Sequence, residues 1–118
     1  MQGSVLHFYI HEHQSHRGRR VWEWLLEQAH AFGIRGGSAF QAAAGFGHHH
    51  TMHDARLAEV AAHSSTVEVE FIVTAEEGRQ LLDMLRRERI RLFFAYVPAR
   101  FGAINPDAAG PPSLAGAS

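Results

Sequence analysis

Histidine is the residue type in this 118-residue chain whose number and spacing most suggest chemistry, because ten are present. Eight of them form two groups, one near the N-terminus and one near the middle: His7, His11, His13 and His16, then His48, His49, His50 and His53. Imidazole is a good ligand for zinc, copper, nickel and iron. One hypothesis is that His48, His49, His50 and His53 hold a divalent transition metal. The competing interpretation is an exposed loop that tolerates histidine, with His53 ordering the loop base by hydrogen bonding.

Arginine supplies all 11 basic residues, and the absence of lysine excludes Schiff-base lysine chemistry and a P-loop lysine. A basic run holds Arg86, Arg87, Arg89 and Arg91 around Glu88. It is either a solvated helix end, where cations favour the helix dipole, or a phosphate contact. In the second case Arg56 and Arg100 are candidate helpers across a subunit boundary.

Gly45 and Gly47 bracket Phe46 in a segment with two interpretations. The glycines either end a strand in a turn, or let the backbone approach an anionic ligand closely. Catalysis has little support, because there is no cysteine and no serine lies in a nucleophile-elbow context. We therefore expect a binding protein rather than an enzyme.

Composition favours one globular domain, since 46% of the residues are hydrophobic and 19% are charged. The formal net charge of -1 argues against nucleic acid as a partner. No run of about 18 apolar residues is present, and the N-terminus lacks the apolar stretch of a signal peptide. A cytoplasmic location is the expectation.

Hydrophobic spacing predicts three elements in the first half of the chain. Residues 5–10 alternate as a strand, and residues 17–32 have the period of a helix that Gly33 ends. In that helix Trp24 is expected to be more exposed than Trp22. Residues 38–44 form a second, alanine-rich strand.

The second half repeats this order. Residues 67–73 alternate most clearly, and Thr74 with Glu77 predicts a capping box that starts a helix to about Arg87. A last strand over 92–97 is closed by Pro98. Residues 1–101 are then one domain, and 102–118, rich in Ala, Gly and Pro, are expected to be a disordered tail.

The resulting β-α-β-β-α-β order predicts an α+β, ferredoxin-like sandwich: a four-stranded antiparallel sheet with two helices on one face. The other sheet face presents Val5, His7 and Tyr9, joined by Phe93, Ala95 and Val97. Such an apolar surface predicts self-association. The first and second strands are expected to run antiparallel, so the histidine-bearing connections that follow them need not lie at the same end of the sheet. This weakens a metal site that joins both connections within one subunit.

Several segments on this order resemble one family over about residues 5–98. They are Arg17-Gly18-Arg19, Ala44-Gly45-Phe46-Gly47, His53-Asp54-Ala55-Arg56-Leu57 and Val67-Glu68-Val69-Glu70-Phe71-Ile72-Val73. The chain is similar in them to the PII-like signalling proteins (domain of unknown function one hundred and ninety), relatives of the nitrogen-regulatory PII proteins.

The resemblance implies a homotrimer whose sheets face inward and whose clefts between subunits bind a small anionic effector such as an adenine nucleotide. It implies that the 46–54 loop, the counterpart of the PII T-loop, relays binding to a partner protein such as a membrane transporter or channel. The candidate ligand-binding residues are Gly45, Phe46, Gly47 and His53 near that loop, together with the arginines Arg56, Arg87, Arg89, Arg91 and Arg100. The chain departs from true PII proteins at 86–91, which lacks their glycines and lysine.

Overall fold

The computed structural model describes residues 1–45 and 65–108, and these contain eight elements. In chain order they are β1 (Gln2–His11), β2 (Ser15–His16), β3 (Arg19–Arg20), α1 (Val21–Ala31), β4 (Gly37–Gln41), β5 (Thr66–Thr74), α3 (Ala75–Glu88) and β6 (Phe93–Arg100). Neither helix in this part of the chain is both long and apolar enough to cross a membrane.

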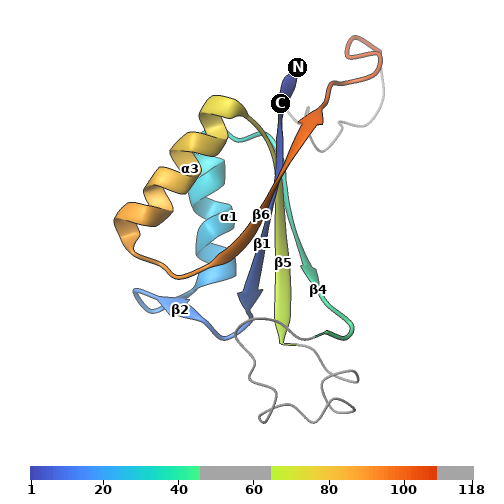
Figure 1. Ribbon diagram of the computed structural model, residues 1–118. Helices are drawn as coiled ribbons and strands as arrows, with labels where there is room; N and C mark the ends of the chain where they lie inside the picture. Colours follow the sequence, from blue (N-terminus) through green and yellow to red (C-terminus); the bar gives the residue numbers. More distant parts are fainter. Residues whose placement is uncertain (46–64, 109–118) are drawn as a thin grey trace.

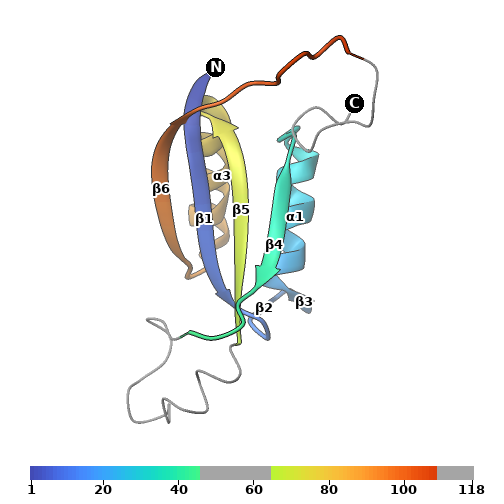
Figure 2. The same cartoon turned by 90° about the vertical axis from the view of Figure 1, so that its right-hand side faces the viewer.

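The main sheet has the strand order β4-β5-β1-β6, and every neighbouring pair in it is antiparallel. Both helices lie on the same side of the sheet (Figure 1). Helix α1 packs on β4 and β5, and α3 packs on β1 and β5. Figure 2 looks onto the sheet face that carries no helix, with β6 and β4 at its two edges. The predicted ferredoxin-like fold is confirmed.

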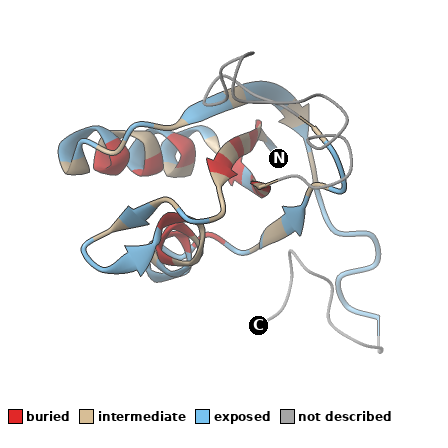
Figure 3. Ribbon diagram, turned by 90° about the horizontal axis from the view of Figure 1, so that it is seen from below, coloured by how far each residue is buried: buried red, intermediate tan, exposed pale blue. Residues whose placement is uncertain are grey.

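The core fills the layer between the helices and the sheet. Leu6, Phe8 and Ile10 of β1 are fully buried, as the strand alternation predicts. The inward-facing residues of β5 and the apolar stripes of the helices complete it: Val67, Val69, Phe71, Val73, Val21, Leu25, Ala29, Leu81, Met84 and Leu85. Buried positions recur along both helices and the central strands (Figure 3).

The opposite face of the sheet carries no helix in the described part of the chain. We call it the outer sheet face, and it contains Val5, His7 and Tyr9 of β1, Ile72 of β5, and Phe93, Ala95 and Val97 of β6. The register places Val5 between Ile72 and Val97, so one apolar row crosses three strands. Val97 is 47% exposed and Phe93 is 50% exposed. The predicted content of this face is confirmed.

The start of α3 and the end of α1 are formed as the sequence predicts. The Thr74 hydroxyl accepts from the Glu77 amide at 3.2 Å, and the Glu77 carboxylate accepts from the Thr74 amide at 2.8 Å. This is the predicted capping box of α3. Gly33 adopts a φ of 85° after α1, and the amides of Gly33 and Ile34 donate to His30 and Ala29. This pair of bonds is a Schellman motif.

Two strand boundaries differ from the prediction. Pro98 does not close the last strand, because β6 continues to Arg100 with Pro98 opposite Ser4. Because β6 is an edge strand, it tolerates Pro98, whose missing amide hydrogen removes no hydrogen bond that the sheet needs. Strand β4 covers Gly37–Gln41 rather than 38–44, because its pairing with β5 ends at Gln41 opposite Val67.

The predicted helix over 17–32 starts too early, because α1 begins only at Val21. Residues 15–20 form the β2–β3 hairpin instead. Trp24 is 9% exposed because it shares the buried face of α1 with Val21 and Leu25, so the prediction that it is the more exposed tryptophan is wrong. Trp22 packs at the edge of the core. Phe32, at the C-cap, is 37% exposed.

The predicted tail lies partly within the described residues. Residues 102–108 have no helix or strand, and the Ala108 amide donates to the Asn105 carbonyl in a turn. Residues 109–118 lie outside the described part, so the disordered tail stays a prediction there.

Candidate functional site

Strands β1 and β4 end at the same end of the sheet. Both are antiparallel to β5, which lies between them, so they run in the same direction. His11 at the end of β1 is opposite Thr66, and Gln41 at the end of β4 is opposite Val67. The expectation that the two histidine-bearing connections need not share an end is therefore wrong, because it ignored the strand that separates β1 from β4.

Several connecting segments meet at this end, which we call the loop-base end: residues 11–20, 42–45, 65 and 86–92 (Figures 1 and 2). The Glu12 amide donates to the Ser65 carbonyl at 2.7 Å. The Gln14 side-chain amide donates to the Arg91 carbonyl at 3.0 Å. The connection after β1 is thus bonded both to the chain that enters β5 and to the link between α3 and β6.

The β2–β3 hairpin is built on an Arg17-Gly18 turn. Both residues have positive φ, 53° for Arg17 and 78° for Gly18. A two-residue hairpin loop of this kind matches the twist of its strands, and glycine adopts the conformation at no steric cost. The turn therefore displays the Arg17 side chain, which is 74% exposed, at the loop-base end.

Glu88, the last residue of α3, fixes this hairpin to the helix. Its Oε1 lies 2.8 Å from His16 Nε2 and 3.2 Å from Arg17 Nη2. The His16 ring also meets Trp24 edge to face at 5.0 Å. The hydrogen bond from His16, and then the charge of Arg17, hold the pKa of Glu88 below its ordinary value. Glu88 is therefore an ionised anchor of the site.

This anchor predicts an acid-sensitive contribution to stability. Because the pKa of Glu88 is lowered in the folded state, its stabilising effect is present above its ordinary pKa of 4.5 and is lost as the pH falls through the folded value. Glu88→Gln is expected to lower the melting temperature at pH 7 and to reduce its decline between pH 5 and pH 3. Thermal unfolding across this range measures both, with Glu23→Gln on α1 as control. A decline in Glu88→Gln as steep as in the wild type would contradict the assignment.

The loop-base end carries a surplus of positive charge. Seven of the 11 arginines lie there, namely Arg17, Arg19, Arg20, Arg86, Arg87, Arg89 and Arg91. Arg17 pairs with Glu88, Arg19 with Glu27, and Arg86 with Asp83. Within the described ranges the remaining four, all exposed, have no ion pair. They can therefore attract an anion without first breaking an internal contact.

Arg89 occupies a position where glycine would be more stable. It follows α3 with a φ of 57°, in the left-handed region. A side chain there costs roughly 1–2 kcal/mol relative to the right-handed conformation, a cost that glycine avoids. Arg17 holds the same type of conformation in the hairpin turn. Two arginines in left-handed positions at one end of the molecule indicate that their guanidinium groups are functional.

The predicted ligand-binding residues do not all lie together. Arg87, Arg89 and Arg91 share the loop-base end with Gly45, but Arg100 is opposite Gln2 at the other end of β6. Gly45 follows β4 and Arg91 precedes β6, and β4 and β6 are the two edge strands of the sheet. Three strand spacings separate those edges, about 14 Å. Phe46, Gly47, His48, His49, His50, His53 and Arg56 lie outside the described residues.

A complete metal site is absent from the part of the chain that the structure describes, since no three potential His, Cys, Asp or Glu ligands are grouped there. His11 and His13 do lie close, with ring centroids 5.6 Å apart. The His13 amide donates to His11 Nδ1 at 3.1 Å, so this histidine pair is locally ordered. The metal hypothesis for His48, His49, His50 and His53 stays a prediction.

Reasoning from the sequence missed three contributors to this end: Gln14, His16 and Glu88. The sequence does hold a clue to Gln14 and His16. The Arg17-Gly18 pair that follows them favours a tight turn rather than a helix interior. Nothing local to Glu88 indicates its partners, which lie 72 and 71 positions earlier in the chain.

A comparison with protein families gives one match. The DUF190 family model, described as "Uncharacterized ACR, COG1993", matches residues 3–90. This range includes five of the six main elements and ends just before β6. No curated protein gives a significant match to the chain.

Proposed function

Because the chain belongs to the DUF190 family of PII-like proteins, we propose that it is a trimeric signalling protein without enzymatic activity. Its effector is a small anion, an adenine nucleotide, bound in the clefts between subunits. The outer sheet faces of three copies meet in the centre of the trimer. The 46–54 loop relays effector binding to a partner protein of the membrane transporter or channel kind.

The observation that carries this proposal is the set of exposed, unpaired guanidinium groups at the loop-base end. Arg87, Arg89 and Arg91 have no ion pair among the residues that the structure describes, and Arg89 is kept in a left-handed position. Guanidinium groups bind phosphate oxygens through paired hydrogen bonds. They replace here the glycine-rich, lysine-bearing segment of true PII proteins.

The separation of Gly45 from Arg91 supports a cleft between subunits. Within one chain Gly45 follows β4 and Arg91 precedes β6, and these are the two edge strands of the sheet. In a closed ring of copies, the β4 edge of one subunit lies near the β6 edge of its neighbour. Gly45 of one copy and the arginines of the next then hold the same nucleotide. Arg100, at the far end of β6, takes part only if it reaches the cleft from a neighbouring copy.

The relay follows from where the effector binds. Gly45 and Ser65 are the described residues that flank 46–64, and Glu12 bonds directly to Ser65. A nucleotide held at Gly45 and the arginines changes the surroundings of both attachment points. Effector binding then favours one arrangement of the intervening chain over others, and the partner protein reads that arrangement.

Arg89→Gly tests the proposal because it is expected to weaken nucleotide binding without lowering the stability of the protein. Isothermal titration calorimetry with ATP, ADP, AMP and cyclic AMP is expected to find at least one ligand. Arg89→Gly is expected to weaken that ligand at least tenfold, through loss of a charge-assisted contact. The same variant is expected to melt at or above the wild-type temperature, because glycine relieves the left-handed strain.

The matched control for this experiment is Arg35→Gln. Arg35 is also exposed and without an ion pair among the described residues, but it lies at the other end of the sheet. Its replacement should leave nucleotide affinity unchanged. Absence of binding by every nucleotide in the panel, or equal loss in both variants, would contradict the proposed site.

The alternative function is a metal-binding or metal-sensing module. The shared end of β1 and β4 favours it, because His11 and His13 then lie at the same end as the attachment points of the histidine-bearing segment. Metal analysis of untagged protein distinguishes the two functions. If the metal bound per chain falls when His48, His49 and His50 are replaced by alanine, the metal-binding function is supported. An unchanged metal stoichiometry would exclude it.

A further inference from the structure

The centre of the outer sheet face is polar. His7 is the middle one of the alternate positions, from Gly3 to His11, that β1 contributes to this face, and its register partner Glu70 is the middle residue of β5. Strands β1 and β5 are also the two inner strands of the sheet. The His7–Glu70 pair therefore lies at the middle of the face both along the strands and across them.

The residues that flank this pair are small. Ala95 of β6 is opposite His7 on one side, and Ser38 of β4 is opposite Glu70 on the other. The His7 ring stacks on Tyr9, with ring centroids 6.4 Å apart and an interplanar angle of 22°. Because side chains of a strand stand roughly perpendicular to the sheet, the imidazole projects from the centre of the face with open space beside it.

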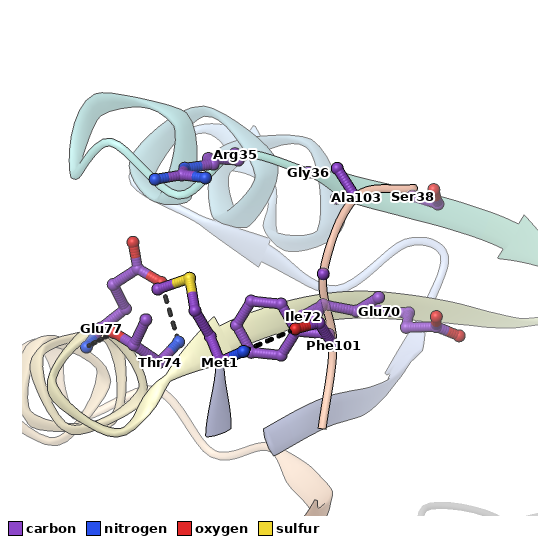
Figure 4. A pocket seen from close by; sticks show the side chains of 12 residues that line it. Met1, Arg35, Gly36, Ser38, Glu70, Ile72, Thr74, Glu77, Phe101 and Ala103 are labelled. Carbon is purple, nitrogen blue, oxygen red and sulfur yellow. Dashed lines mark hydrogen bonds between the residues drawn. The ribbon is translucent and has the colours of Figure 1, made fainter. Parts of the chain in front are cut away.

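The two ring nitrogens of His7 have different surroundings. Nδ1 lies 3.8 Å from Oε2 of Glu70, whose carboxylate points away from Met1 and Phe101 in the close view (Figure 4). Nε2, on the other side of the ring, has no hydrogen bond to any residue in the described ranges. Histidine ligands of metal ions have this arrangement, because a carboxylate beside one nitrogen orients the ring and makes the other nitrogen a better ligand.

The outer sheet face carries negative charge. Its strands place Glu68 and Glu70 on this face and no arginine, within the residues that the structure describes. In the proposed trimer, three copies of each glutamate are withdrawn from water around one axis. Carboxylates buried without a compensating charge are costly, so the centre of the trimer favours a positive ion.

The dimensions of three inward-facing sheets bring the three His7 side chains together. Strands lie about 4.8 Å apart, so a four-stranded sheet is roughly 14–19 Å wide, and the centre of a triangle of three such sheets lies roughly 4–6 Å from the middle of each. An imidazole and a metal–nitrogen bond of about 2 Å span that distance. By symmetry, a side chain that reaches the three-fold axis meets the same side chain of both other copies.

We propose that the three His7 side chains of the trimer hold one divalent transition metal ion of the zinc type on the three-fold axis, with the Glu70 carboxylates behind them. The inference rests on the trimer of the proposed function but not on its nucleotide. Each chain supplies one ligand, which agrees with the absence of three grouped ligands from the described part of a single chain. The ion enters as the subunits assemble and stabilises the trimer against dissociation.

The test uses full-length, untagged protein in which His48, His49 and His50 are replaced by alanine, so that the loop histidines contribute nothing. After treatment with EDTA and equilibration with zinc chloride, this protein should contain one zinc ion per three chains. Zinc should also raise its melting temperature. Cobalt(II) in place of zinc should give the strong visible absorption of tetrahedral coordination, with water as the fourth ligand.

Three further substitutions in this background locate the ion. His7→Asn should lose the ion and the effect of zinc on the melting temperature. Glu70→Gln should weaken zinc about 10–100-fold and keep the same stoichiometry at saturation, because it only orients the ligand. The matched control is His30→Asn, at an exposed residue in the last turn of α1 on the helix side of the sheet, and it should bind zinc unchanged.

Sedimentation velocity of the same samples separates this inference from the proposed function. A trimer without zinc, a trimer with one ion per chain, or zinc retained by His7→Asn would overturn the metal site and leave the trimer in place. An octahedral cobalt spectrum, or equal zinc loss in His30→Asn, would also overturn it. A monomeric wild type would overturn both the trimer and the metal site.

Discussion

Replacing Val97 with aspartate is expected to convert the protein from a trimer into a monomer. Val97 lies on the outer sheet face, 47% exposed, in the apolar row with Val5 and Ile72. In the proposed trimer this row is covered by neighbouring copies. A buried, unpaired carboxylate costs several kcal/mol, and each trimer would contain three of them. This total penalty is larger than the net binding free energy of an interface between such small subunits.

Sedimentation velocity measures the outcome directly. The wild type should sediment with three times the chain mass of 13.1 kDa, and Val97→Asp with the mass of one chain. Tyr96→Asp is the matched control, because Tyr96 is the neighbouring residue of β6, is 46% exposed, and points to the other face of the sheet. It should remain trimeric even if it melts earlier. A trimeric Val97→Asp protein would place the interface elsewhere.

The parts of the fold that the sequence predicts are those set by local periodicity. Strand alternation over 5–10 and 67–73 identifies the buried and outer sides of β1 and β5 without error, because a half-buried strand must alternate. The Thr74–Glu77 capping box likewise depends on residues three apart.

The errors arise where long-range pairing decides the structure. Pro98 closes a strand only if the strand is central, and the edge position of β6 follows from sheet order rather than from its own residues. The helical period that starts at Val21 is strong enough to mask the Arg17-Gly18 turn, so the sequence alone predicts a helix that begins too early.

The candidate site was predictable in its residue types but not in its assembly. Arg87, Arg89 and Arg91 are visible in the sequence as a basic run, and the structure places them at one end. Arg100 belongs to the opposite end because β6 is eight residues long, roughly 23 Å between its first and last residues. The left-handed backbone of Arg89 is a structural finding that no sequence period reveals, and it gives the strongest reason to assign that side chain a function.

Replacing Phe8 with alanine is expected to lower the free energy of unfolding by about 3–5 kcal/mol, through lost burial and a cavity. Phe8 is fully buried at the middle of β1, meets Phe71 edge to face at 6.1 Å, and lies 6.1 Å from Phe94. Phe32→Ala, at a residue 37% exposed beside the helix end, should cost only about 1 kcal/mol. Urea unfolding followed by circular dichroism measures both, and similar costs for the two variants would contradict this account of the core.

The same experiment separates the core from the interface if it is repeated at several protein concentrations. Unfolding of a trimer depends on concentration, because dissociation is part of the reaction. Phe8→Ala acts on the helix side of β1, so its unfolding midpoint should fall but keep the concentration dependence of the wild type. Val97→Asp acts on the outer sheet face, so its midpoint should become independent of concentration. If Phe8→Ala also lost the dependence, the core and the interface would form a single cooperative unit, and the outer sheet face alone would not account for assembly.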